Sequence, residues 1–172
     1  SAYRPSPSDC CVPILNAQLG GQAKASDGKP VTIPPSAALV QRGPIVQVSI
    51  SVGQAIAQQI LQQGGTLPPP AIGWALIDTG ATSTCIDEVA AQKLALPAID
   101  VVTVASASHA ATQQNVYPIS IEVVGLPIVV NAPRAIGAAL EAQGLLLLIG
   151  RDLLQACILI YNGPAGQFTL TL

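Results

Sequence analysis

The most constraining feature of the sequence is an apolar run that ends in a carboxylate. Residues 75–77 lead directly into Asp78, which is followed by Thr79 and Gly80. Aspartate has a poor propensity for strands, so an Asp at the end of a buried strand needs a specific role. Glycine allows a sharp turn and a close approach of the backbone to a ligand. The short hydroxyls that can bond to a carboxylate or to nearby backbone are Thr79, Thr82, Ser83 and Thr84.

The remaining pattern predicts short strands rather than long helices. Alternating or wholly apolar runs predict strands at 45–52, 73–77, 101–104, 116–124, 126–130, 145–149, 157–161 and 167–172. The run 145–149 is apolar throughout, which predicts burial on both faces. Short helices are predicted at 54–63, 88–94 and 136–143, the second capped by Asp87, and residues 150–156 are predicted to form a turn that leads into a short helix. Such a pattern predicts a mainly β fold built as a closed or partly closed barrel, with Trp74 and Tyr117 in its core or at its rim.

The first quarter of the chain differs in composition from the rest. Residues 1–43 are rich in Pro, Gly, Ser and Gln, and the prolines exclude long helices there. We expect an extended N-terminal arm over 1–43, disordered at its start, with short extended pieces at 12–15 and 31–33. One domain is expected over 44–172, since a chain of 172 residues can bury a real core.

Composition excludes several classes of function. Only 9% of the residues are charged and the net charge is −2, without a basic stripe, so we expect no binding of nucleic acid. No apolar run approaches the roughly 20 residues that a membrane span needs. Hydrophobic residues make up 50% of the chain. This apolar composition indicates either surface buried against a partner or a count raised by small residues.

The cysteines and the single histidine do not indicate a metal or redox site. Cys10 and Cys11 are adjacent, and with Cys85 and Cys157 they match no zinc or redox spacing, so reduced structural thiols are favoured. His109 is interpreted as a solvated loop residue, and no cofactor or metal is expected. No signal peptide is recognisable. The cellular location is undetermined, with a cytoplasmic one favoured, and whether an upstream segment was removed stays open.

Two elements of the sequence resemble those of aspartic proteases. Leu76-Ile77-Asp78-Thr79-Gly80-Ala81 resembles the active-site loop, which is two apolar residues followed by Asp-Thr-Gly-Ala or Asp-Thr-Gly-Ser. Leu148-Ile149-Gly150-Arg151-Asp152 follows roughly 70 residues later and resembles the second element, two apolar residues followed by Gly-Arg-Asn or Gly-Arg-Asp. Over about residues 44–172 the chain is similar to retroviral proteases, to the protease-like domains of eukaryotic DNA-damage-inducible proteins and, most of all, to bacterial single-domain retropepsin-like proteins.

The resemblance implies a closed acid-protease β-barrel and a homodimeric endopeptidase. The chain carries a single Asp-Thr-Gly, and the chemistry needs two carboxylates, so Asp78 of two protomers would meet at a two-fold axis. Two carboxylates in contact cannot both ionise easily. One would therefore accept a proton from water while the other protonates the oxygen of the scissile carbonyl. The substrate would be an extended peptide or protein, cleaved best at mildly acidic pH.

The resemblance also implies roles for the residues around Asp78. Thr79 would form hydrogen bonds across the dimer, and Gly80 would offer its carbonyl to the peptide. Ala81, Thr82 and Thr84 would support the loop. The structural second motif would consist of Gly150, Arg151 and Asp152. The flap that closes over the peptide would be the hairpin tip, formed by Ala105, Ser106, Ala107, Ser108, His109 and Ala110 and continuing to about Thr112.

Departures from the family pattern leave other functions open. The hairpin tip is rich in Ala and Ser, whereas retroviral flap tips are rich in glycine. Retroviral enzymes often have an Asp at the position of Thr82, so Arg151 needs another partner, either Asp152 or a backbone carbonyl. One alternative is a catalytically silent dimeric peptide-binding module of the same fold. Another is a zymogen in which the N-terminal arm blocks the groove.

Overall fold

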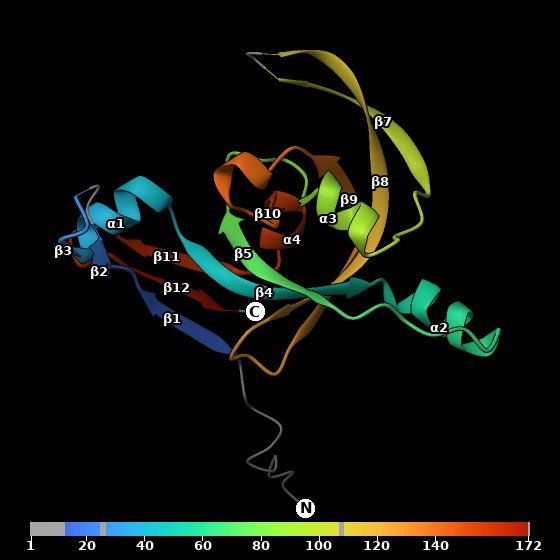
Figure 1. Ribbon diagram of the computed structural model, residues 1–172, viewed down its shortest axis with the longest axis horizontal. Coiled ribbons are helices and arrows are strands. Elements are labelled where there is room, and N and C mark those ends of the chain that lie inside the picture. Colours follow the sequence, from blue (N-terminus) through green and yellow to red (C-terminus); the bar gives the residue numbers. More distant parts are fainter. Residues whose placement is uncertain (1–12, 25–26, 107–108, 172) are drawn as a thin grey trace, which may run out of the picture.

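The computed structural model describes residues 13–24, 27–106 and 109–171 (Figure 1). The expectation of disorder at the start of the chain, and those made for Cys10, Cys11, Ala107 and Ser108, concern residues outside this description. No helix in the described part is long and apolar enough to cross a membrane.

Six strands close into a barrel. Around the ring the order is β4 (Ile45–Val52), β5 (Ala71–Ile77), β10 (Leu147–Ile149), β6 (Cys85–Asp87), β9 (Val129–Ala138) and β8 (His109–Val123), which pairs with β4 again. The pairs β5–β10 and β6–β9 are parallel, and the other pairs of the ring are antiparallel. The expected mainly β fold, a closed barrel with a few short helices, is confirmed.

The alternating pattern of β4 and β8 positions the core. Val48, Ile50 and Val52 of β4 are buried inside the ring, and Ile119 and Ile121 of β8 are buried opposite them. Each side chain of this size contributes about 1.5–3 kcal/mol when it is removed from water. Barrel closure therefore rests on a strand periodicity that is visible in the sequence.

A second sheet covers one end of the same core. Its order is β1 (Ile14–Gln18), β12 (Gln167–Thr171) and β11 (Ile158–Asn162), so the predicted closing hairpin is confirmed. Phe168 and Leu170 of β12 are buried in the common core. The hairpin of β2 (Gly21–Lys24) and β3 (Pro30–Ile33) and the helix α1 (Pro35–Arg42) lead from β1 into β4.

The remaining elements are short and connect the strands of the barrel. Helix α2 (Gln54–Gln62) lies between β4 and β5 and extends away from the barrel in Figure 1. Helix α3 (Glu88–Lys93) follows β6, and its predicted cap is confirmed because the Ala90 N–H donates to Asp87 Oδ2 at 3.0 Å. Strand β7 (Asp100–Ser106) pairs with β8 outside the ring, and helix α4 (Arg151–Leu154) follows β10.

Three predictions of secondary structure were wrong in detail. The strand predicted over 126–130 begins only at Val129, because residues 124–128 form the connection between β8 and β9. The helix predicted over 136–143 is a continuation of strand β9, followed by a 3₁₀ helix at Glu141–Gln143. Long-range pairing decides this, because Ile136 bonds in register with Cys85 on one side and with Val116 on the other. The helix propensity of these residues is too small to outweigh such pairing. The apolar strand begins at Leu147 rather than 145, and Leu148 is half-buried rather than buried.

Candidate functional site

Asp78 lies where two parallel strands end side by side. Strands β5 and β10 pair in register, Ile77 with Ile149, so the residues that follow them emerge at the same edge. The Asp78 N–H donates to the carbonyl oxygen of Ile149 at 3.0 Å. The Asp78 side chain is half-buried, and its Oδ1 accepts from the Gly80 N–H at 2.8 Å. This bond fixes one carboxylate oxygen, while Oδ2 has no hydrogen bond to the described residues.

The guanidinium group of Arg151 holds the Asp78 loop from outside. It donates to the carbonyl oxygen of Thr79 at 2.9 Å, to that of Gly80 at 3.3 Å and to Thr82 Oγ1 at 2.9 Å. The Arg151 N–H donates to the carbonyl oxygen of Ala81 at 3.0 Å. A planar group with several donors can satisfy carbonyls of successive residues in this way. Backbone carbonyls and Thr82 are therefore the partners of Arg151.

Thr84 joins the two sequence elements from inside. Its completely buried hydroxyl donates to Asp152 Oδ1 at 2.8 Å and accepts from the Gly150 N–H at 3.1 Å. The Thr84 N–H donates to Asp152 Oδ2 at 2.9 Å. A Cβ at Gly150 would lie 2.5 Å from the Ser83 carbonyl carbon, so only glycine fits this close approach. The two motifs thus form one hydrogen-bonded unit.

The hairpin of β7 and β8 corresponds to the segment for which a flap is expected. Its pairing runs from Asp100 with Val116 to Ser106 with His109, with an irregularity after Val104. In Figure 1 the hairpin extends beyond the barrel and bends toward the side of the view on which β5 and β10 lie. For Ala105, Ser106, His109 and Ala110, the description covers the backbone only.

The base of this hairpin is tied to its neighbours by a polar cluster that sequence reasoning missed. Glu88 Oε1 accepts from the Tyr117 hydroxyl at 2.7 Å and from Asn115 Nδ2 at 3.0 Å. Burial raises the pKa of the Tyr117 hydroxyl, and its hydrogen bond to the Glu88 carboxylate raises this pKa further. On the outside, Arg134 of β9 pairs with Asp100 of β7 at 2.6 Å, and this hydrogen bond lowers the pKa of Asp100. No sequence motif marks these contacts, because each joins distant elements.

The two cysteines in the described part are free thiols. Cys85 is half-buried in β6 and directly follows Thr84, which joins the two motifs. Burial raises the pKa of the Cys85 thiol, and the nearby negative charges of Asp152 and Asp78 raise it further. Burial alone raises the pKa of Cys157. Within the described residues, no group of three or more His, Cys, Asp or Glu could hold a metal ion.

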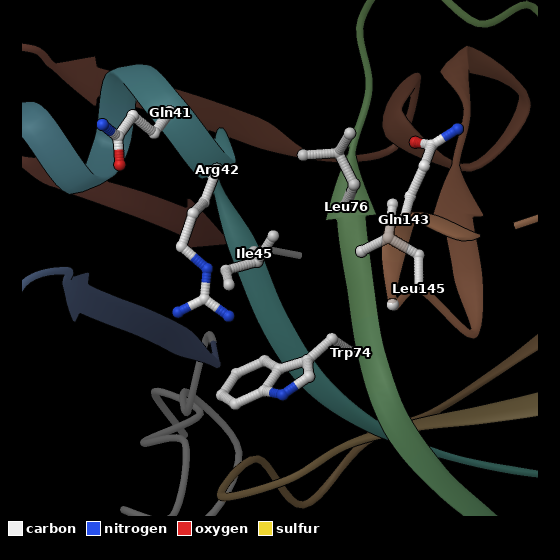
Figure 2. A pocket seen from close by; sticks show the side chains of 8 residues that line it. Gln41, Arg42, Ile45, Trp74, Leu76, Gln143 and Leu145 are labelled. Atoms are coloured by element: carbon white, nitrogen blue, oxygen red, sulfur yellow. The ribbon is translucent and has the colours of Figure 1, made fainter. Parts of the chain in front are cut away.

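A cavity of about 340 Å³ adjoins β5 on the face that carries Trp74 and Leu76 (Figure 2). Trp74, Leu76 and Asp78 occupy alternate positions, and Trp74 and Leu76 both line the cavity. Trp74 is 41% exposed, so it lies on a surface pocket rather than in the core, whereas Tyr117 is in the core. Arg42, at the end of α1, places its guanidinium carbon 5.8 Å from the centre of the Trp74 ring. The alternation of Trp74, Leu76 and Asp78 is the signal in the sequence that could have revealed this site.

Comparison with solved structures shows similarity to a retropepsin-like aspartic protease from Rickettsia conorii. The sequence identity is 14%, the TM-score is 0.42, and the match covers 92% of this chain and 92% of that chain. No protein-family model and no curated protein matches the sequence.

Proposed function

We propose that the chain is an aspartic endopeptidase of retropepsin type that acts as a homodimer, with Asp78 of two protomers as the catalytic pair. The observation that carries the proposal is the joining of the two motifs around Thr84. Gly150 and Asp152 bind this buried residue, and Arg151 holds the neighbouring loop carbonyls. Such a rigid support is what a carboxylate needs when it must be positioned within a fraction of an ångström for catalysis.

The geometry of Asp78 fits general acid/base activation of a water molecule. The Gly80 N–H orients Oδ1, and Oδ2 remains available to a water molecule or to the carboxyl group of a partner. In the pair, the ionised carboxylate accepts a proton as water attacks the scissile carbonyl. The protonated carboxyl group donates its proton to the carbonyl oxygen, and a tetrahedral intermediate forms. As the intermediate collapses and the C–N bond breaks, the carboxyl group that took the proton from water gives it to the amine nitrogen. The other carboxylate takes a proton from a hydroxyl group of the intermediate, which restores the starting pair.

One chain supplies half of this site. A single carboxylate cannot serve as acid and base in the same step, so a second copy related by a two-fold axis would complete the pair. The extended substrate would lie between the paired Asp78 loops and the hairpin of β7 and β8, where backbone hydrogen bonds can add it as a strand. Arg151 bonds to the Thr79 carbonyl oxygen and leaves the Thr79 side chain exposed. An exposed side chain is compatible with the hydrogen bonds across the dimer that are expected of Thr79.

The decisive experiment compares the parent protein with Asp78→Asn on a pool of peptides at pH 4–6, a range chosen for a shared proton. We expect cleavage to fall by about 100-fold or more, since one member of the acid/base pair is lost. Asp27→Asn, an exposed aspartate between β2 and β3 that pairs only with Lys29 in the described part of the chain, serves as the matched control and should cleave at the parental rate. Equal cleavage by Asp78→Asn and the parent would exclude the mechanism.

The dimer is tested by sedimentation with and without pepstatin, an analogue of the transition state. A completed pair should bind it tightly and shift the mass to that of two chains. Binding of ordinary peptides without turnover would instead support the silent peptide-binding module. Appearance of a shorter, more active chain after acid incubation would support the zymogen.

A further inference from the structure

The cavity beside β5 contains a positive charge that has no acidic partner among the residues that the structure describes. Arg42 forms no ion pair and no side-chain hydrogen bond within the described part of the chain, and no acidic residue lines the cavity. Its contact is the face of Trp74, as Figure 2 shows. The other polar side chains at the cavity are the neutral amides of Gln41 and Gln143. The cavity is therefore complementary to a negative charge.

The fold places the residue that carries the guanidinium group beside β5. Gly43 ends α1 with a φ of 69°, and a Cβ there would lie 2.6 Å from Leu76 Cδ1, so the end of the helix packs directly on β5. A guanidinium group that stacks on an indole ring keeps its N–H edges directed outward. These edges match the two oxygens of a carboxylate.

The cavity also lies within reach of a peptide held at Asp78. Strand residues advance by about 3.4 Å, so the Cα atoms of Leu76 and Trp74 lie roughly 7 and 14 Å from that of Asp78. An extended peptide advances by the same amount per residue. A side chain that enters the cavity therefore belongs to a residue no more than about four positions from the bond at Asp78.

We propose that this cavity is a specificity-determining subsite in which Arg42, stacked on Trp74, binds the carboxylate of an Asp or Glu side chain of the peptide. Leu76 and Leu145 contact the aliphatic part of that side chain. The proposal rests on the proposed peptidase function and adds a preference for acidic residues near the cleaved bond.

Trp74 provides a direct probe, because it is the only tryptophan in the chain. The experiment uses the full chain with Asp78→Asn, which prevents turnover, and capped octapeptides in which a single Glu is moved along an otherwise uncharged sequence. Matching peptides carry Gln in place of Glu. Tryptophan emission is followed during titration at pH 6, where the Glu side chain is ionised.

We expect a saturable change in emission, with one Glu position binding about tenfold more tightly than its Gln counterpart, because the hydrogen bonds are charge-assisted. The preference should decrease with added salt. It should disappear in Asp78→Asn combined with Arg42→Gln, and remain in part with Arg42→Lys. Equal binding of Glu and Gln peptides, or a preference that survives Arg42→Gln, would overturn the proposal.

A second measurement separates this proposal from the proposed function. Cleavage sites in a peptide pool are mapped for the parent and for Arg42→Gln, and the enrichment of Asp and Glu near the cut should be lost in the variant. Asp78-dependent cleavage without acidic enrichment would overturn the subsite alone. Acid-selective binding without cleavage would overturn the peptidase alone. If Arg42→Gln lowers the sedimentation mass and leaves peptide preference unchanged, the cavity receives a second protomer and the subsite is overturned.

Discussion

Replacing Thr84 with valine removes the hydroxyl that links the two motifs while nearly preserving side-chain volume. The substitution deletes the hydrogen bond to Asp152 Oδ1 at 2.8 Å and leaves the Gly150 N–H, bonded at 3.1 Å, without its acceptor. A hydrogen bond to a charged group contributes about 1.5–3 kcal/mol, and a buried unpaired N–H costs about 1–3 kcal/mol. Asp152 Oδ1 keeps the Leu153 N–H at 3.0 Å, and the valine methyl group is favourably buried. We therefore expect a net loss of about 2–3 kcal/mol of unfolding free energy.

Urea denaturation measures this loss. For a chain of this size the dependence of the unfolding free energy on urea is about 2 kcal/mol per molar, so the midpoint should fall by about 1 M or slightly more. Parent and variant must be compared at one protein concentration, because a dimer makes apparent stability depend on concentration. The slope should be unchanged, since the surface exposed on unfolding is the same.

Thr82→Val is the matched control in the same loop. The Thr82 hydroxyl is exposed and accepts from Arg151 Nη2 at 2.9 Å, so its loss should cost less than about 1 kcal/mol. Equal losses of stability in the two variants would contradict this role of the Thr84 hydroxyl. An unfolding free energy of Thr84→Val within about 0.5 kcal/mol of the parent's, a difference typical of a surface substitution, would contradict it as well.

Three further predictions follow from other contacts. Asp87→Ala removes the acceptors of three backbone N–H groups, those of Ala90, Leu140 and Glu141. Thermal unfolding should therefore report a loss of about 3–4 kcal/mol of unfolding free energy. A loss under about 1 kcal/mol would contradict the role of this buried carboxylate. In Arg151→Lys, the ammonium group cannot bond to both loop carbonyl oxygens as the guanidinium group does. Peptide cleavage should therefore fall by about tenfold, while the unfolding free energy measured in urea changes by less than about 1 kcal/mol. Unchanged cleavage would count against support of the loop by this group. The raised pKa of Cys85 favours its neutral thiol in the folded state, so its contribution to stability is present below pH 9.0 and decreases as pH rises through the raised value. Labelling by a thiol reagent at pH 8, mapped by mass spectrometry, should accordingly be slower at Cys85 in the folded than in the unfolded chain, and equal rates would contradict this.

Local patterns predicted most strands, because a period of two and its bounding turns are encoded in neighbouring residues. Those of β4, β11 and β12 are examples, as is the capping role of Asp87. The same reasoning failed over 136–143, where alanines favour a helix locally but pairing on both sides imposes a strand. It also missed the bonds from Leu140 and Glu141 to Asp87, since no periodicity links residues so far apart in the chain.

The sequence by itself determined the strand that ends at Asp78, the glycines and hydroxyls that follow it, and the second motif at 150–152, because these depend on residue chemistry and short spacing. Only the tertiary structure decided that β10 pairs in parallel with β5 and in antiparallel with β6, and the second pairing places Thr84 beside Gly150 and Asp152. It also decided that Arg42 stacks on Trp74. Such contacts depend on which buried faces pack together, and that choice is made by the whole core rather than by any single segment.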